Sequence, residues 1–266
     1  MTRQIGEILQ VFEAIAPLGL AEDWDNVGLL LAPRDNAQIS GVLLTIDLTE
    51  AVLREARTEA TDLVIAYHPP IFKGPKRLTR RTAAERILID ALTAGLFVYS
   101  PHTALDAAPG GLNEWLGGLL GSGRGRPIIA HARLEGVGAG RVVELDTPVT
   151  LVDAIARIKT GLGLSHLRVA ATHQHQAGEP IRSFAVCAGA GGSVFEHLRH
   201  ADLLLTGEMR HHDILARVSN SMSVIVTDHT NTERGYLPLL KTHVEQRLPG
   251  LTVHVATADR DPLEPR

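Results

Sequence analysis

The sequence predicts an α/β fold made of two related α/β halves, and three observations support this prediction. Short apolar runs alternate with stretches of helical periodicity, which is typical of βαβ units around a largely parallel, buried sheet. The second half partly repeats the first, because residues 61–68 (TDLVIAYH) resemble residues 201–208 (ADLLLTGE). Polar residues follow strands in both halves. We therefore expect a cleft at the carboxyl ends of the strands, where open α/β sheets bind ligands.

The expected elements of the first half follow from periodicity and from helix signals. Apolar residues at helical spacing, ended by Pro17 and Gly19, predict a helix over residues 5–15. The apolar run 41–46 predicts a strand, and the capping-box spacing of Asp47 and Glu50 predicts a helix through about residue 58. The remaining elements are a strand at 63–66, a helix at 82–93, a strand at 96–99 and a helix at 112–120.

The glycine-rich segment 121–127 (GSGRGRP) is the best linker candidate, so we expect two domains, residues 1–124 and 125–266. The second alternates in the same way, and its final helix and strand can pack back on the first half. Ser193 and Glu196 have the spacing of a capping box. The expected strands are 142–145, 184–187, 203–205, 224–226 and 251–256, and the expected helices are 151–160, 194–200, 212–218 and 237–245.

Composition excludes several classes of protein. The 266 residues are 44% hydrophobic, enough for a sizeable core, and the net charge of −4 argues against direct binding to nucleic acid or to an anionic membrane. A single cysteine, Cys187, rules out an internal disulfide and fits a reducing compartment. We expect a soluble cytoplasmic protein, since no signal peptide or membrane-spanning run is evident. The basic run 73–81 (KGPKRLTRR) is either a solvated turn, the commoner case, or a rim that attracts anions.

Histidines and carboxylates at strand ends are the candidate metal ligands. His229 and Glu233 lie four residues apart after an apolar strand, so a helix there would place both on one face. His102 and Asp106 repeat the pattern in the first half, and His68 follows the strand at 63–66. Any one of these pairs is more often an ordinary polar pair, but their recurrence in both halves favours ligands. Imidazole with carboxylate suits Zn, Fe(II), Mn or Co better than Ca or Mg. Gathered carboxylates repel unless a cation offsets them, which favours a dinuclear site bridged by Glu233 or Asp106.

Six motifs are spread along nearly the whole chain. They are residues 23–28 (DWDNVG), 67–72 (YHPPIF), 100–106 (SPHTALD), 110–113 (GGLN), 206–213 (TGEMRHHD) and 229–235 (HTNTERG). Each motif is weak alone, but together they specifically resemble those of the Nif-three-like dinuclear-metal family, also catalogued as type-two GTP cyclohydrolase I. The YHPP form is similar to the eukaryotic-type branch.

The resemblance implies a ligand set and an assembly. The family's metal ligands fall here on Tyr67, His68, Asp106, His229 and Glu233. Tyr67 departs from the histidine of many bacterial relatives, and tyrosine, with a pKa of about 10, is a poorer ligand. One metal position is then weak, empty, or completed by His102 or water. The resemblance implies one or two divalent transition-metal ions per chain (Zn, Fe or Mn) and a homo-oligomeric ring, commonly a hexamer.

Two functions from different classes fit these residues. One is a metal-dependent hydrolase acting on a nucleotide-like or phosphoester substrate, with Glu208 and His212 as catalytic candidates. The other is a non-catalytic metal-dependent binding or adaptor protein, or a metal carrier, which the departure at Tyr67 favours slightly. The loop 187–193 (CAGAGGS) is either a phosphate site or, more commonly, a tight turn. Asp25 is expected to shape a turn.

Overall fold

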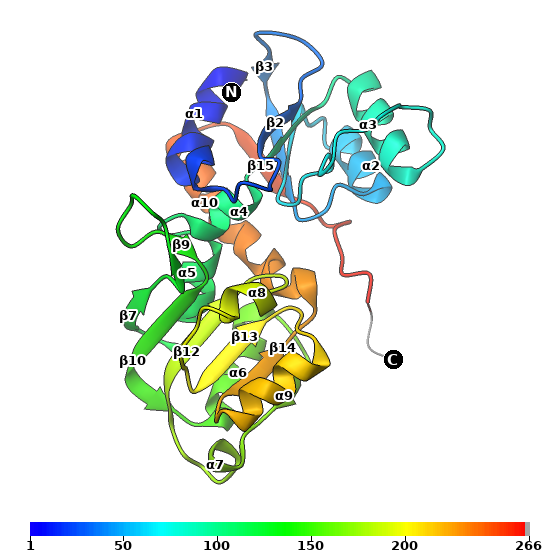
Figure 1. Ribbon diagram of the computed structural model, residues 1–266. Helices are drawn as coiled ribbons and strands as arrows, with labels where there is room; N and C mark the ends of the chain where they lie inside the picture. The colour runs from blue at the N-terminus through cyan, green and yellow to red at the C-terminus, as the bar shows by residue number, and fades with distance from the viewer. Residues whose placement is uncertain (264–266) are drawn as a thin grey trace. The chain divides into compact units, whose positions relative to one another are not determined.

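The computed structural model describes residues 1–263, which fold into two compact units (Figure 1). One unit comprises Met1–Leu105 and the described residues from Tyr236 on, and the other comprises Asp106–Gly235. Each unit contains its own sheet with helices packed against it. The α/β fold class predicted from the sequence is confirmed.

The first unit is built on a five-stranded sheet with the order β15-β4-β5-β6-β2. All neighbouring strands are parallel except β2, which pairs antiparallel with β6. The three central strands are fully buried, and this burial explains their unbroken apolar sequences. The strands are β2 (Gly28–Leu31), β4 (Gly41–Thr45), β5 (Leu63–Ala66), β6 (Phe97–Ser100) and β15 (Thr252–Val255).

Helices of the first unit supply the apolar faces that cover this sheet. α2 and α3 contact each other and share one apolar cluster with the sheet, whereas α10 packs on β15 and β4. The helices are α1 (Ile5–Ile15), η1 (Leu18–Leu20), α2 (Glu50–Thr58), α3 (Ala83–Thr93) and α10 (Leu237–Arg247). A short ladder joins β1 (Arg3–Gln4) to β3 (Gln38–Ile39).

The second unit is built on a six-stranded sheet with the order β11-β14-β13-β12-β10-β7. Its central strands β12, β13 and β14 are parallel, whereas β10, β7 and β11 pair antiparallel with their neighbours. The expected largely parallel arrangement is thus found in the first sheet, except at β2, but in the second sheet it holds only for β12, β13 and β14. The strands are β7 (Gly123–Arg126), β10 (Arg141–Val149), β11 (Arg168–Ala170), β12 (Ile181–Cys187), β13 (Leu203–Thr206) and β14 (Ser223–Val226).

The other elements of the second unit are short apart from α6. A small hairpin joins β8 (Ile129–Ala130) to β9 (Gly138–Ala139). The helices are α4 (His102–Ala107), in which the chain passes from one unit to the other, α5 (Leu112–Gly117), η2 (Gly118–Leu120), α6 (Leu151–Leu162), α7 (His173–Gln176), α8 (Gly192–Phe195), α9 (His211–Ser219), η3 (His229–Thr232) and η4 (Arg234–Tyr236).

The internal repeat is visible in the topology of the two sheets. The parallel triplet β4-β5-β6 in one unit matches the triplet β12-β13-β14 in the other. The middle strands, β5 and β13, are those of the two similar sequence runs. His68 and Glu208 both stand two residues past the end of the middle strand, and each donates its backbone N–H to the chain leaving the preceding strand, at Ile46 and Gly189. The repeat therefore places a candidate site residue at the same point of each sheet.

Three local predictions are wrong. The expected linker at 121–127 contains β7, an exposed edge strand whose glycines and arginines disguise its pairing with β10. The cap of α2 is Thr49, whose hydroxyl accepts the N–H of Val52, rather than Asp47. The helix expected over 194–200 is only the four-residue α8, which begins at Gly192 after the N-cap residue Gly191 and has no side-chain cap from Ser193.

Arg141 on β10 joins several segments of the second unit. Its guanidinium is buried and donates hydrogen bonds to the carbonyl oxygens of Gly138 (2.6 Å), Gly140 (2.9 Å) and Ala107 (3.1 Å). It also pairs with Glu114, at 3.2 Å from Nη2 to Oε1. Buried carbonyl groups that lose such donors destabilise a fold, so this one side chain ties residues 138–140 to the end of α4.

We expect Arg141→Met to lower the free energy of unfolding by about 3 kcal/mol, because it leaves buried acceptors unsatisfied. Arg124→Met on the exposed strand β7 is the matched control, with an expected change within about 0.5 kcal/mol. Urea unfolding followed by circular dichroism measures both. Equal stabilities of the two variants would contradict this role for Arg141.

Within residues 1–263, no helix is long and apolar enough to cross a membrane.

Candidate metal centre

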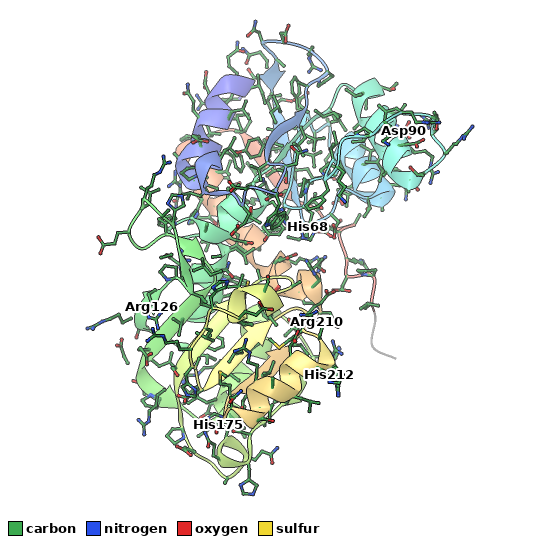
Figure 2. All side chains as sticks on the ribbon, viewed as in Figure 1. His68, Asp90, Arg126, His175, Arg210 and His212 are labelled. Carbon is green, nitrogen blue, oxygen red and sulfur yellow. The ribbon has the colours of Figure 1, made fainter. Side chains whose placement is uncertain are left out.

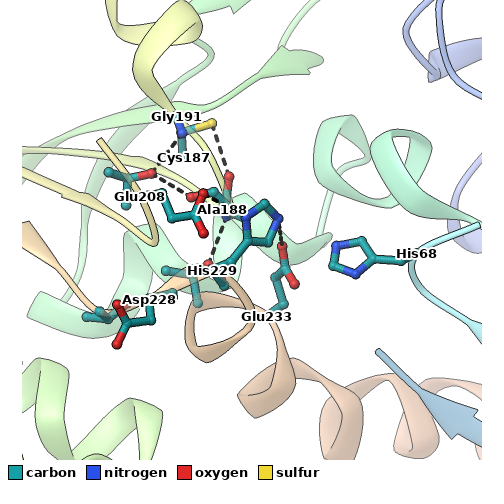
Figure 3. Close-up of polar contacts among 12 residues, drawn as sticks. His68, Cys187, Ala188, Gly191, Glu208, Asp228, His229 and Glu233 are labelled. Atoms are coloured by element: carbon teal, nitrogen blue, oxygen red, sulfur yellow. Dashed lines mark hydrogen bonds and ion pairs between the residues drawn. The ribbon is translucent and has the colours of Figure 1, made fainter. Parts of the chain in front are cut away.

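His229 and Glu233 are brought together just after β14. The expected α-helix there is instead the 3-10 turn η3, which begins after Asp228 at a positive φ of 68°. The Thr232 hydroxyl donates to the His229 carbonyl oxygen at 2.7 Å, and this hydrogen bond fixes the turn. His229 Nε2 consequently lies 3.5 Å from Oε1 of Glu233 (Figure 3). An imidazole nitrogen beside a buried carboxylate could hold a metal ion.

A glycine makes room for this pair. Gly189, in the loop after β12, has a φ of +60°, and a Cβ atom there would lie 2.8 Å from His229 Nε2 and 2.9 Å from Glu233 Oε1. Any other residue would therefore push into the two candidate ligand atoms. Its N–H donates to Thr232 Oγ1 at 2.9 Å, which ties the loop to the same turn. The space that Gly189 leaves for His229 and Glu233 was not predicted from the sequence, although the run of small residues at 188–192 is typical of a close approach of the backbone.

The same loop was one candidate for a phosphate site. Its backbone N–H groups are used within the protein: Ala188 donates to Asn113 Oδ1, Gly189 to Thr232 and Gly191 to Thr206 Oγ1, all at 2.9 Å. These donors do not point to an anion. The alternative reading, a tight turn that packs chain segments together, describes the loop correctly.

In the first unit, His68 and His102 form an aromatic cluster with Tyr67. The ring centroids of His68 and His102 lie 5.4 Å apart, and Tyr67 lies 5.0 Å from the first and 5.4 Å from the second. His68 follows β5 and His102 follows β6, so neighbouring parallel strands deliver both imidazoles to the same edge of the sheet. Tyr67 is buried, and its carbonyl oxygen accepts a hydrogen bond from Ser100.

Carboxylates contact the Nδ1 atom of all three histidines. The distances are 2.9 Å from His68 to Asp47, 2.8 Å from His102 to Asp25 and 3.5 Å from His229 to Glu208. A carboxylate at Nδ1 holds the proton there, so the lone pair of Nε2 is available to a metal. This carboxylate–histidine arrangement is typical of metal ligands.

The contact of Asp25 with His102 was not predicted from the sequence, which indicated only a turn at Asp25. Its side chain is fully buried. Burial alone would raise the pKa of Asp25, but hydrogen bonds from His102 and Thr103 outweigh burial and lower it. Asp25 is therefore ionised at neutral pH and orients His102. Its stabilising contribution is present above the ordinary aspartate pKa and is lost as the pH falls through the depressed value.

Relatives of known sequence and structure place the chain in a family. A profile described as Duf34/NIF3 (NGG1p interacting factor 3) matches residues 3–262. The chain belongs to this family. The NIF3 homolog of Schizosaccharomyces pombe is 40% identical over 270 residues, covering 97% of this chain and 96% of that protein. NIF3-like protein 1 of Rattus norvegicus is 34% identical over 346 residues, covering 96% and 91%.

The fold of this NIF3-family chain also matches solved structures. The crystal structure of a Bacillus cereus protein related to NIF3 superposes with a TM-score of 0.85 at 18% identity, covering 98% of this chain and 99% of that one. At that identity the match shows the fold alone. The resemblance to the Nif-three-like family that the motifs indicated is confirmed, and the two named relatives are eukaryotic proteins, as the YHPP form at residues 67–70 led us to expect.

The other candidate residues of this NIF3-family chain lie as follows. Asp106 is half-buried in α4, and its carbonyl oxygen accepts a hydrogen bond from Asn113. Glu208 is an exposed carboxylate against His229. His212 lies on the exposed first turn of α9 (Figure 2), and in the described part of the chain its ring contact is with His211, at 5.3 Å between centroids. Catalytic roles for Glu208 and His212 stay predictions.

Proposed function

We propose that this chain binds a divalent transition-metal ion through His229 and Glu233, with His68, Asp106 and His102 as further ligands. The observation that carries this proposal is the 3.5 Å approach of His229 Nε2 to Glu233 Oε1 in the space left by Gly189. The donor set consists of imidazole nitrogens and carboxylate oxygens, which fits Zn, Fe or Mn. One or two such ions per chain are part of the proposal.

The finer proposal is a metal-dependent hydrolase for a nucleotide-like or phosphoester substrate. A bound divalent ion would supply a Lewis acid that polarises the attacked group and lowers the pKa of water. Among the chain's own residues, Glu208 contacts His229 Nδ1. Its carboxylate is exposed, so it is placed to pass a proton between this site and solvent. We expect Glu208→Gln, assayed at saturating metal so that its metal content equals that of the parent, to lose most turnover.

Hydrolysis assays on metal-loaded protein test this proposal, with nucleoside triphosphates and phosphomonoesters as substrates. Turnover that disappears in Glu208→Gln at unchanged metal content supports a hydrolase. A second candidate function is a non-catalytic metal-binding protein or metal carrier, favoured by the buried Tyr67 in a position where many bacterial relatives have histidine. Metal-loaded protein without turnover on either substrate class would favour this candidate.

The carboxylates behind the histidines give a separate prediction. Asp47→Asn is expected to weaken metal binding about 10–100-fold, because the amide no longer holds the His68 proton on Nδ1. Asp25→Asn tests His102 in the same way. Asp35→Asn, at an exposed position, is the control for loss of one negative charge. Metal titration by calorimetry measures all three, and an Asp47→Asn affinity equal to that of the control would exclude His68 as a ligand.

A further inference from the structure

A basic groove of about 480 Å³ lies along the loop that leads from β5 into α3. Four cationic side chains line it, against the single carboxylate of Glu85. The four cations are Lys73, Lys76, Arg77 and Arg81. All four are exposed, and among residues 1–263 no ion pair is seen for any of them, in contrast to the neighbouring Arg80 and Arg86, which pair with Asp90 and Glu50.

Hydrogen bonds hold residues 79–81, at the end of this loop, in place. The Glu85 carboxylate accepts from the hydroxyl of Thr79 at 2.7 Å, from its N–H at 3.0 Å and from the N–H of Arg81 at 2.9 Å. These bonds, the Thr79 hydroxyl first, lower the pKa of Glu85. Two hydrogen bonds, of 2.6 and 3.2 Å, tie Arg80 to Asp90, which Figure 2 labels. The end of the loop, which carries Arg81, is thus held in place, and this reduces the ordering cost of binding an anion there.

The groove adjoins a second one that contains a candidate metal ligand. Pro70 lines both grooves, and the second, of about 620 Å³, is lined by His68 and Asp47 among others. Both grooves belong to the first unit. A ligand held at the basic groove therefore lies next to the groove that His68 lines, with Pro70 common to both.

We propose that the basic groove binds the phosphate groups of a phosphorylated small-molecule substrate whose reacting end extends along Pro70 toward His68. The inference rests on the proposed function and names its substrate class. The whole chain has a net charge of −4, so the four cations form a local positive region on an acidic protein. Such a region attracts phosphate groups, which form strong charge-assisted hydrogen bonds with arginine and lysine.

The test is calorimetric titration of metal-stripped full-length protein with inorganic triphosphate and with a nucleoside triphosphate. The groove variant carries Lys76→Gln, Arg77→Gln and Arg81→Gln. A matched variant with Arg124→Gln, Arg126→Gln and Arg133→Gln removes the same charge from the second unit. We expect the groove variant to bind both probes roughly tenfold to a hundredfold more weakly. The matched variant should stay within about twofold, because distant exposed charges are screened.

Three outcomes would overturn the proposal. The first is equal binding of the triphosphates by the parent protein and the groove variant. The second is equal weakening of binding in the two triple variants. The third is a single-stranded oligonucleotide that competes better than either triphosphate, which would assign the groove to a polynucleotide. Metal content of each variant, and triphosphate binding by His229→Ala, separate this proposal from the metal centre. A protein that binds no metal but binds triphosphate at the groove would contradict the metal centre alone. A protein that binds metal but binds no triphosphate at the groove would contradict the groove proposal alone.

Discussion

Glu233→Ala is expected to remove most of the bound metal and to leave the fold intact. Glu233 is buried, and its carboxylate faces His229 Nε2 at 3.5 Å. Loss of a carboxylate that orients a ligand already costs about 10–100-fold in metal affinity, so loss of a direct ligand should reach or exceed roughly 100-fold. Metal titration and elemental analysis measure the effect, with circular dichroism as the check on folding. His229→Ala should behave in the same way.

Glu245→Gln provides the control for Glu233→Ala, because Glu245 is an exposed glutamate of α10 that pairs with Lys241. It should keep the full metal content. If Glu233→Ala also keeps it, Glu233 is not a ligand and the proposed set fails.

The second large effect is expected for Gly189→Ala. The added Cβ atom would lie 2.8 Å from His229 Nε2 and 2.9 Å from Glu233 Oε1, closer than real Cβ atoms are found, so these side chains must shift. The positive φ of +60° adds a backbone cost of about 1–2 kcal/mol for alanine. We expect metal binding to be lost and the free energy of unfolding to fall.

Gly163→Ala separates the effect of the positive φ from the effect of the close contact with His229. Gly163 ends α6 with a φ of +69°, and an added Cβ there meets no atom within 4 Å. It should therefore lose stability through backbone strain alone and retain metal. Metal binding by Gly189→Ala at the level of Gly163→Ala would show that the Gly189 loop does not shape the centre.

Local sequence patterns predicted most of the elements because these elements depend on nearby residues. The buried strands β4, β5, β12 and β13 were found from their apolar runs, and α1 from its helical spacing. Strand β7 was missed because its glycines and arginines carry no apolar signal, and only its pairing with β10 across the sequence defines it. A helix was considered after β14 because His229 and Glu233 have helical spacing. The chain instead forms the 3-10 turn η3, in which the Thr232 hydroxyl donates locally to the His229 carbonyl oxygen and accepts the N–H of Gly189, 43 residues earlier.

The candidate ligands could be predicted because their spacing repeats at strand ends in both halves. Their supporting residues could not. Asp47 and Asp25 lie far along the chain from the histidines that they orient, by 21 and 77 residues, so no local pattern joins them. Gly189 was hidden in the same way, since its closest atoms belong to residues 40 or more positions later in the chain.

The most direct test of the central claim is the metal content of untagged protein purified without added metal, measured beside Tyr67→His. The proposed metal centre requires at least one divalent transition-metal ion per chain. The metal content should be lower in His229→Ala and in Glu233→Ala. Near two ions per chain in the parent would support a dinuclear centre, and one ion that rises in Tyr67→His would place the deficit at Tyr67. If neither protein holds metal, even after loading with Zn, Fe or Mn, the proposed metal centre at His229 and Glu233 is wrong.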